Sequence, residues 1–552
     1  MIRRGNARKM LCRILGFCAL VCFLCLGDRW DALSAMSSTQ PKHFVGFDLG
    51  TSGVRISVVE RTEEGSLAEV HSQAISWPNG VYDDADIWME SVESLLEQAR
   101  ESSALNKTLK HVKAICISGT SSSCILVDGK NTGKPSRPSA RMYNFDVVST
   151  VRDEGMDPIH GVRALEWIAQ FAPEQHTARS ATGSLAKLLS WHDEQPLQPG
   201  ERLAHQSDYI SLRLMSNDKA CGSQRNERFV NSDWHNVLKL GYDVRNLEFP
   251  QWLVDCLDSV GLSAESVLPR KVVSPGEPMG TISPDVAKRL DLNDDTVIVG
   301  GTTDSNAAFL AATAMDSIVA PSTAVVSLGS TLAIKQVSTT YVEDASVGVY
   351  SHRYPSVLLP KEEESLEGEQ RADEAWLVGG ASNVGCAVLR QEAFSVDELQ
   401  SLSNDIDPNT ESPLSYYPLT RKGERFPVAD SNKEPNLSPK VDDRKDYLHG
   451  ILQGISDVEI DGFKALAKLG ASPAKPGKIW TCGGGAQNDM WSEMRQRRLK
   501  EAFGNEYAEV AKAENVEASF CAAILAAASF PADASTGTEN SVGASAKTAV
   551  ES

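Results

Sequence analysis

The stretch FVGFDLGTSGVRISVVE, residues 44–60, decides the fold. It opens with a short apolar run typical of a buried strand, breaks at the glycine-containing residues 50–53, and resumes as alternating apolar and polar residues. A strand, a tight turn and an antiparallel strand are therefore predicted. The glycines let successive backbone N–H groups face an anion, Thr51 and Ser52 add hydroxyl donors, and the Asp48 carboxylate can hold hydrated Mg²⁺. The pattern predicts a phosphate and metal cradle, although a plain glycine hairpin with a capping aspartate has the same sequence.

Two later stretches favour the ligand-binding interpretation. In VIVGGTTDSNAA, residues 297–308, a predicted strand runs into a Gly-Gly turn, and Asp304 stands at or near the start of an alanine-rich helix. A carboxylate there can accept a proton from a substrate hydroxyl, and helix capping is the alternative role. VVSLGSTLAI, residues 325–334, repeats the opening pattern of strand, glycine–hydroxyl turn and strand. The repeat predicts two domains of related topology, each presenting a phosphate turn to a shared cleft.

Two more strand ends carry residues suited to a ligand. IWTCGGGAQNDMW, residues 479–491, has glycines that let a flat ring lie against backbone, an asparagine that can read a heterocycle edge, and Trp491 to cover a ring face. A tight strand-to-helix turn with a packed Trp491 is the alternative. SGTSSS, residues 118–123, follows a predicted strand, which is a usual place for a polar ligand in an α/β sheet, although a serine-rich turn has the same sequence.

Composition narrows the class of protein. A chain of 552 residues exceeds one ordinary core and predicts two large domains. Its 54 basic and 74 acidic residues give a net charge of −20, which disfavours nucleic acid and anionic membranes as partners. Of the 11 cysteines, four lie in the N-terminal segment and the other seven are scattered with no metal-type pairing, so we expect buried thiols in a reducing compartment.

The chain begins with a predicted targeting segment, residues 1–42. A basic start precedes an uncharged, mostly apolar run at 14–26, which is short for a membrane span and typical of a signal peptide. We expect cleavage, no stable membrane association after processing, and a plastid (chloroplast) destination. The alternatives are a cytoplasmic protein translated from Met36 and a membrane anchor. Residues 355–374 are predicted to form a solvated acidic loop, and residues 531–552 a disordered tail.

In this order and spacing, the motifs resemble the FGGY family of carbohydrate kinases over roughly residues 43–530. The resemblance is nearest to the plant and cyanobacterial D-ribulose kinases described as xylulose-kinase-like, and it includes the runs at 118–121, 205–208, 238–243, 301–304 and 351–353. It implies an α/β, two-domain actin/hexokinase-like (ribonuclease H-like) fold with a ligand cleft between the domains. The implied domains are 43–313 and 314–530.

The resemblance also implies roles for individual residues, with ATP, Mg²⁺ and a small-molecule sugar as ligands of a monomer or homodimer. Asp48 would orient the metal and the substrate, and Asp304 would take the proton from the sugar hydroxyl. The remaining implied contacts are Gly50, Thr51 and Ser52 in the first phosphate turn; Gly329, Ser330 and Thr331 in the second; Gly484, Gly485, Asn488 and Trp491 around adenine; and Ser121, with Asp48 and Asp304, at the sugar.

One departure bears on the substrate. Typical xylulokinases carry a Gln-Met-His-Gly run where this chain has residues 118–121, and the Arg-Glu pair of glycerol kinases is also missing there. The difference favours D-ribulose, with D-xylulose or another sugar or polyol as the alternative. A nucleotide-binding chaperone or filament protein of the same fold, or an inactive regulator, is a different class of protein. The sugar-side runs together with Asp48 and Asp304 argue against both.

Overall fold

The computed structural model describes residues 41–62, 65–129, 132–149, 157–215, 229–314, 319–359, 374–504 and 509–530. Nearly all of the predicted targeting segment, most of the predicted acidic loop and the whole predicted tail lie outside these residues and stay predictions. Within the described part of the chain, every helix is too short or too polar to cross a bilayer. The cysteines described there are free thiols, at positions 116, 124, 256, 386, 482 and 521.

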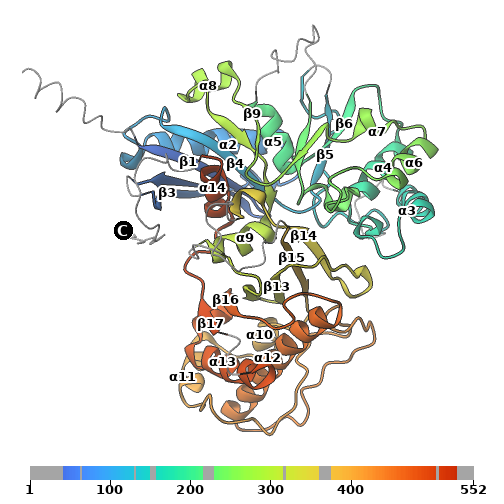
Figure 1. Cartoon of the computed structure of the whole chain (residues 1–552). Coiled ribbons are helices and arrows are strands. Elements are labelled where there is room, and N and C mark those ends of the chain that lie inside the picture. The colour runs from blue at the N-terminus through green and yellow to red at the C-terminus, as the bar shows by residue number, and fades with distance from the viewer. Residues whose placement is uncertain are drawn as a thin grey trace, which may run out of the picture. The chain divides into compact units, whose positions relative to one another are not determined.

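Two sheets organise the described residues (Figure 1). The strands of the first sheet are, in spatial order, β3 (Leu67–Ser76), β2 (Gly53–Arg61), β1 (Lys42–Leu49), β4 (Val112–Gly119), β10 (Val297–Val299) and β9 (Pro278–Thr281), with β11 (Thr302–Thr303) also paired to β4. The predicted hairpin is confirmed, because β1 pairs antiparallel with β2 and Leu49 lies opposite Val54. On its other side β1 runs parallel to β4, which places the ends of both strands at one edge.

The central strands of the second sheet repeat the arrangement of the first. Its strands are β14 (Tyr350–Arg353), β15 (Trp376–Ala381), β13 (Leu332–Ser338), β12 (Ala324–Leu328), β16 (Lys478–Cys482) and β17 (Glu509–Lys512). Strands β12 and β13 form the second predicted hairpin, with Leu328 opposite Leu332, and β12 runs parallel to β16. Both sheets thus join an antiparallel hairpin to parallel neighbours, as the repeated sequence pattern predicts.

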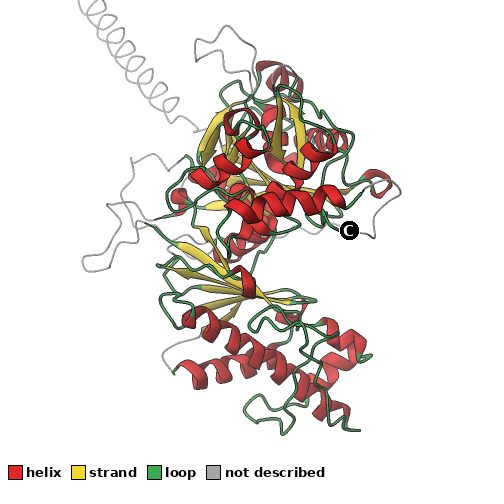
Figure 2. Ribbon diagram, turned by 90° about the vertical axis from the view of Figure 1, so that its right-hand side faces the viewer, coloured by secondary structure: helices red, strands yellow, loops and turns green. Residues whose placement is uncertain are grey.

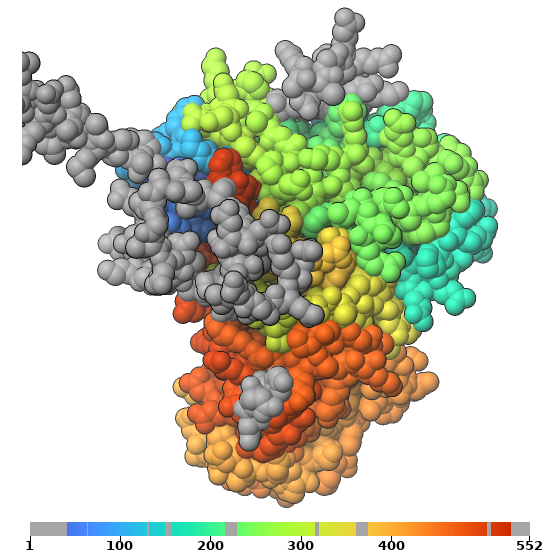
Figure 3. Space-filling model, viewed as in Figure 1, coloured from blue at the N-terminus to red at the C-terminus, as the bar shows by residue number. Residues whose placement is uncertain are grey.

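Helix α14 (Ala518–Ala528) packs on the first sheet, although it falls within the range predicted for the second domain. Gly46 explains how close it comes, because a Cβ at this position would lie 2.0 Å from the Ser519 carbonyl oxygen. The Ser57 and Ser519 hydroxyls are hydrogen-bonded at 2.8 Å in the same contact. Figure 3 shows the red residues of α14 beside the blue N-terminal strands. The last described helix therefore belongs to the core of the first sheet, and the boundary after residue 313 stays a prediction.

Helix α9 (Asp304–Thr313) joins α14 in a buried apolar cluster that both sheets share. Phe44 and Cys116 contribute from the first sheet, and Val325 and Val337 from the second. The alanines of α9 and α14 allow the helices to approach the strands closely, because a small side chain adds little thickness. The predicted alanine-rich helix that begins at Asp304 is thereby confirmed.

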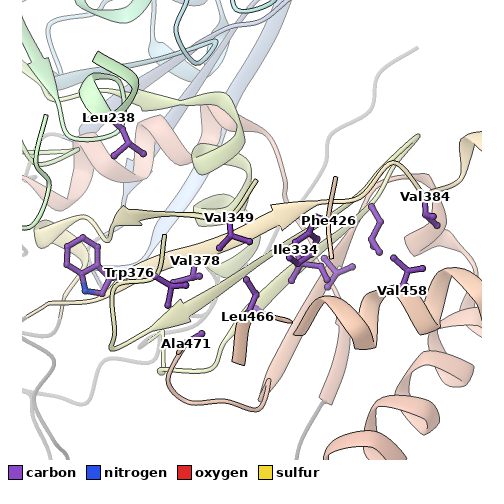
Figure 4. Close-up of a cluster of buried hydrophobic side chains, with 14 of the residues drawn as sticks. Leu238, Ile334, Val349, Trp376, Val378, Val384, Phe426, Val458, Leu466 and Ala471 are labelled. Atoms are coloured by element: carbon purple, nitrogen blue, oxygen red, sulfur yellow. The ribbon is translucent and has the colours of Figure 1, made fainter. Parts of the chain in front are cut away.

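The outer faces carry other helices (Figure 2). Helix α2 (Ala85–Arg100) begins where the Asp84 carboxylate accepts hydrogen bonds from the N–H groups of residues 86 and 87, and its apolar residues recur at helical spacing against β2 and β3. Helix α12 (Arg444–Lys468) packs against the second sheet, where Leu466 and Val458 lie near Ile334 and Phe426 in the close-up of that core (Figure 4).

The other regular elements complete the described fold. They are the pairs β5 (Cys124–Asp128) with β6 (Glu201–His205) and β7 (Asn231–Asp233) with β8 (Lys271–Val273), and the helices α3 (Ile159–Phe171), α4 (Ser184–Glu194), α5 (Gln206–Leu214), α6 (Gln251–Ser259), α7 (Ala264–Val267), α8 (Pro284–Leu290), α10 (Ala387–Gln391), α11 (Val396–Asn404) and α13 (Asp489–Phe503).

Candidate active site

The first predicted phosphate turn is a closed loop with exposed hydroxyl residues. The Gly50 N–H donates to the Gly53 carbonyl at 2.9 Å, and the indole N–H of the buried Trp77 donates to the Gly50 carbonyl at 3.0 Å. These bonds fix the backbone of the turn. Thr51 and Ser52, between the two glycines, are exposed. The turn can therefore offer hydroxyl donors to an anion without rearranging the strands.

The second predicted turn is braced from the side by α10. The Gly329 carbonyl accepts a hydrogen bond from the Cys386 N–H at 2.8 Å, and the exposed Arg390 guanidinium donates to the Ser330 hydroxyl at 3.1 Å. Ser330 and Thr331 are exposed. A cation that already contacts a turn hydroxyl adds local positive charge, which an acidic protein needs in order to hold phosphate.

Two carboxylates meet at the edge of the first sheet. Asp48 lies opposite Ser118 in the β1–β4 ladder, Thr302 of β11 pairs with the same Ser118, and Asp304 follows β11 as the first residue of α9. Burial, and then the negative charge of Asp304, raise the pKa of Asp48 from an ordinary 3.8 to about 7. The sheet therefore brings Asp48 and Asp304, the two residues predicted to be catalytic, close enough for their charges to interact.

The pKa of Asp304 is set by a different combination of effects. Burial raises its pKa, whereas the Ser305 backbone N–H, which donates to Oδ1 at 2.7 Å, lowers it, as do the positive charges of Lys335 and Lys239. The strongest charge acting on Asp48 is thus another carboxylate, whereas two lysines favour the ionised form of Asp304. An ionised Asp304 is what a general base requires.

The carboxylate oxygens also fit a magnesium ion. The buried Asp48 Oδ1 atom has no hydrogen-bond partner among the residues that the structure describes. Mg²⁺ prefers oxygen ligands, commonly one or two carboxylates together with water and substrate phosphate. An uncompensated carboxylate oxygen beside a phosphate turn therefore fits the predicted ion.

The serine-rich run after β4 forms a buried polar turn. The Thr120 N–H and hydroxyl both donate to Gln206 Oε1 at 3.1 Å, and the Thr120 and Ser123 hydroxyls lie 2.5 Å apart. Ser121, the predicted sugar contact, is half-buried within this turn. Gln206 begins α5, so the turn is tied to a helix that covers the first sheet. Sequence reasoning did not single out Gln206 by itself, although it lies in the motif at 205–208.

The predicted adenine stretch is divided between open and packed residues. Gly484 is exposed, and a Cβ there would meet no atom within 4 Å. A Cβ at Gly485 would lie 2.7 Å from Leu328 Cβ and from Trp491 Cζ3, so this glycine is needed for packing. Asn488 is half-buried and caps α13, because its side-chain oxygen accepts from the Trp491 N–H at 3.0 Å.

Trp491 does not present a ring face to a ligand in this structure. Its side chain is 1% exposed, and its indole N–H donates to the Leu452 carbonyl at 3.1 Å and to the Ser456 hydroxyl at 3.0 Å, both on α12. The tryptophan therefore fills the packing role that the sequence left open as the alternative. It positions the turn at 483–487 by holding α13 against α12.

The structure adds a lysine that the sequence reasoning missed. The Lys335 ammonium donates to Ser305 Oγ at 3.3 Å and to Asn306 Oδ1, in the first turn of α9. Burial lowers the pKa of Lys335 to about 7, although the charge of Asp304 opposes this effect. Strand alternation could have indicated this position. Lys335 is two residues before Val337 on β13 and therefore lies on the same face, and the Val337 side chain is in the core between the sheets.

A second missed group is a buried polar network beside the site. Asn236 Nδ2 donates to Asp233 Oδ2 at 2.7 Å and to Ser207 Oγ at 3.0 Å. His235 Nε2 donates to the Arg353 carbonyl of β14 at 2.8 Å, so Nδ1 accepts from the Thr302 hydroxyl at 2.7 Å. Burial lowers the pKa of His235 to about 3, which keeps the ring neutral in this tautomer. The network fixes β11, and with it the position of Asp304.

Comparisons with known proteins agree with this architecture. No family model matches the chain. The chain is 21% identical to the xylulose kinase of Escherichia coli (strain K12) over 82% of its own length and 84% of that protein. It superposes on the crystal structure of a xyloylose kinase from Brucella ovis with a TM-score of 0.67 and 20% identity, covering 89% of this chain and 91% of that one.

The chain is also similar to the solved structure of a kinase named for a different acceptor, glycerol. The glycerol kinase of Plasmodium falciparum with ADP gives a TM-score of 0.65 at 14% identity, covering 88% of this chain and 89% of that one. Together with the paired sheets and the shared helices between them, these likenesses establish the fold. The chain has the two-sheet α/β architecture of the actin/hexokinase-like sugar kinases.

Proposed function

We propose that this protein is an ATP-dependent carbohydrate kinase of the FGGY type that phosphorylates the terminal hydroxyl of a pentulose. The observation that carries the proposal is the meeting of Asp48 and Asp304 at the edge of the first sheet, where Asp48 lies just before the first glycine–hydroxyl turn. The similarity to kinases named for xylulose and glycerol supports the reaction class.

The chemistry follows from the positions of these groups. Asp304 accepts the proton of the sugar hydroxyl while that oxygen forms a bond to the γ-phosphorus of ATP. The bond from the γ-phosphorus to the bridging oxygen breaks, and its electron pair leaves with ADP. Phosphoryl transfer depends mainly on alignment and charge stabilisation, so the hydroxyls and backbone of the two turns, with Arg390 beside Ser330, are suited to orient the phosphates.

Asp48 is the residue that would hold the magnesium ion. The bound ion supplies charge neutralisation for the phosphate oxygens. Asp48 itself contributes a carboxylate oxygen that is buried and has no hydrogen-bond partner within the described residues. Gly484, Gly485 and Asn488 are the residues that we propose for the adenine side.

For the substrate we propose D-ribulose, converted into D-ribulose 5-phosphate. The support is the run at 118–121, which replaces the residues of typical xylulokinases and here forms a buried turn of small hydroxyl side chains. The names of the similar proteins favour D-xylulose to a comparable degree, and one fold serves several acceptors. D-xylulose therefore stands as the second candidate.

The test is an assay of ADP release with parallel acceptors. We would supply D-ribulose, D-xylulose, L-ribulose, glycerol and no acceptor to the purified protein with ATP and Mg²⁺. The proposal expects the highest kcat/KM with D-ribulose. A preference for D-xylulose would support the proposed kinase activity but contradict the proposed substrate. ADP release that does not depend on any acceptor would favour a non-sugar ATP-binding protein.

We also propose that the protein acts in a plastid, as its first 42 residues predict. A fluorescent protein fused after residue 42 should then accumulate in plastids. A cytoplasmic signal from the same fusion, unchanged when translation starts at Met36, would favour the alternative.

A further inference from the structure

A buried lysine contacts the serine-rich turn that follows β4. Lys187, on α4, is 0% exposed, and its ammonium donates to the Ser122 carbonyl at 2.9 Å and to the Met142 carbonyl at 2.8 Å. Burial of an ammonium carries a desolvation cost that only good hydrogen bonds offset. A methionine would fill a similar volume without that cost. The role of Lys187 is therefore its hydrogen bonding rather than its packing.

The first of the two carbonyls belongs to a residue with an unfavourable backbone conformation. The Ser123 N–H donates to the Thr120 carbonyl at 3.1 Å, so Ser122 is the third residue of a four-residue turn. Its φ is 65°, in the left-handed region that suits glycine better than serine. Other residues stay in this region where the surrounding structure holds them. The Lys187 ammonium is such a restraint, because it donates to the carbonyl of Ser122 itself.

Two helices hold the turn at the residues that flank Ser121. Gln206, the first residue of α5, accepts hydrogen bonds from the Thr120 N–H and hydroxyl, and Lys187 of α4 holds Ser122. Ser121, the residue predicted to contact the sugar, lies between these two positions and is half-buried. The restraints on its neighbours therefore set the position of Ser121.

The second carbonyl connects the turn to a later segment of the chain. Met142, which accepts from Lys187, precedes Tyr143, whose N–H donates to the Ser123 hydroxyl at 2.8 Å. One ammonium thus fixes the turn at 120–123 against residues 142–143. Loss of its two hydrogen bonds should loosen both segments together.

We infer that Lys187 is a positioning residue for the acceptor side of the site, whose ammonium holds the Ser122 carbonyl and so keeps Ser121 where the sugar binds. This inference rests on the proposed kinase function. It gives a role in sugar binding to a residue of α4 that lies outside both phosphate turns and outside the predicted sugar contacts.

The experiment measures kcat/KM for D-ribulose and for D-xylulose, together with KM for ATP. Lys187→Met removes both hydrogen bonds and fills a similar volume. Leu188→Ala is the matched control, because Leu188 is the next residue of α4 and its truncation opens a cavity in the core without removing a hydrogen bond of the turn. Displacement of a binding group by about 1 Å can cost about 100-fold, so we expect Lys187→Met to lower kcat/KM for the better pentulose by about 10- to 100-fold. KM for ATP should stay near the wild-type value in both variants, and Leu188→Ala should also retain its kcat/KM for the sugar.

A second substitution tests how the effect arises. Ser122→Gly removes the cost of the positive φ, so by itself it should leave kcat/KM near the wild-type value. Combined with Lys187→Met, it should recover about fivefold or more of the lost kcat/KM, because the turn then needs less restraint. Wild-type sugar kinetics in Lys187→Met, an equal loss in Leu188→Ala, or no recovery in the double variant would overturn the inference. Lys187→Gln, which is too short to reach both carbonyls, replaces Lys187→Met if that variant does not fold.

Hydrogen exchange of residues 118–124, followed by mass spectrometry, gives a readout that does not depend on activity. The Ser123 N–H lies in this segment, and exchange there should be faster in Lys187→Met than in the wild type. Exchange that stays as slow as in the wild type would overturn the inference. Failure of the kinase proposal is separate, because the wild type itself would then show no sugar-dependent ADP release, and the exchange measurement would still decide whether Lys187 holds the turn.

Discussion

Replacing Asp48 with asparagine should stabilise the protein while it inactivates the enzyme. The Asp48 carboxyl is buried beside Asp304, and these two effects raise its pKa from 3.8 to about 7. A raised pKa means that the folded protein binds the proton more tightly than the unfolded chain does. The favourable contribution to folding is complete below pH 3.8 and is lost as the pH rises through about 7.

The size of the effect follows from that difference. About three pKa units, at about 1.36 kcal/mol each, give a cost of about 4 kcal/mol for the ionised carboxylate at pH 8. At pH 5 the folded protein keeps Asp48 protonated, whereas the unfolded chain has this carboxyl mostly ionised. Folding must then take up a proton, which lowers the free energy of unfolding by about 2 kcal/mol. The asparagine side chain is neutral at every pH, so the Asp48→Asn variant should exceed the wild type in free energy of unfolding by these amounts.

Urea unfolding at pH 5 and pH 8, followed by tryptophan fluorescence and circular dichroism, measures the difference. Asp294→Asn, at an exposed position in the loop before β10, is the matched control and should leave stability nearly unchanged at both pH values. Activity of Asp48→Asn should fall sharply in the same preparations. A variant that is no more stable than the wild type at pH 8, or equally more stable at both pH values, would refute the burial and charge argument.

Three further substitutions probe the site and its support. Asp304→Asn should lower kcat by about 100- to 10,000-fold through loss of the general base, with ATP affinity measured by calorimetry near the wild-type value; an unchanged kcat would remove the base assignment. Trp491→Ala should lower the free energy of unfolding by about 3–5 kcal/mol as a cavity opens between α12 and α13, and a stable variant with weakened ATP binding alone would restore the adenine role. Gly46→Ala should separate α14 from β1, because the added Cβ would lie 2.0 Å from the Ser519 carbonyl oxygen; hydrogen exchange of α14 as slow as in the wild type would contradict this contact.

Local sequence patterns predicted the hairpins and the position of Asp304 well. Apolar alternation interrupted by a glycine–hydroxyl turn is a short-range signal, and both hairpins, at 42–61 and 324–338, have the pairing it indicates. The helix at 304–313 follows a strand and a glycine turn, as expected. The related order of the two sheets follows from the repetition of one pattern.

Long-range contacts could not be predicted in the same way. Nothing local in the sequence shows which sheet α14 covers, and the close approach at Gly46 shows that it is the first. The burial of Trp491 depends on α12, which begins at Arg444 and provides its hydrogen-bond acceptors. Lys335 contacts Asn306, which lies 29 positions earlier in the chain, and a lone lysine on a strand does not reveal such a partner.

Phosphoryl transfer to a sugar is tested by quantifying both products of a single reaction. ADP would be quantified enzymatically and the sugar phosphate by ³¹P NMR, with D-ribulose and ATP as substrates. We expect one sugar phosphate for each ADP, with the phosphorus on the terminal oxygen, and almost no ADP without sugar. ADP formed without a matching sugar phosphate, for every pentulose supplied, would contradict it.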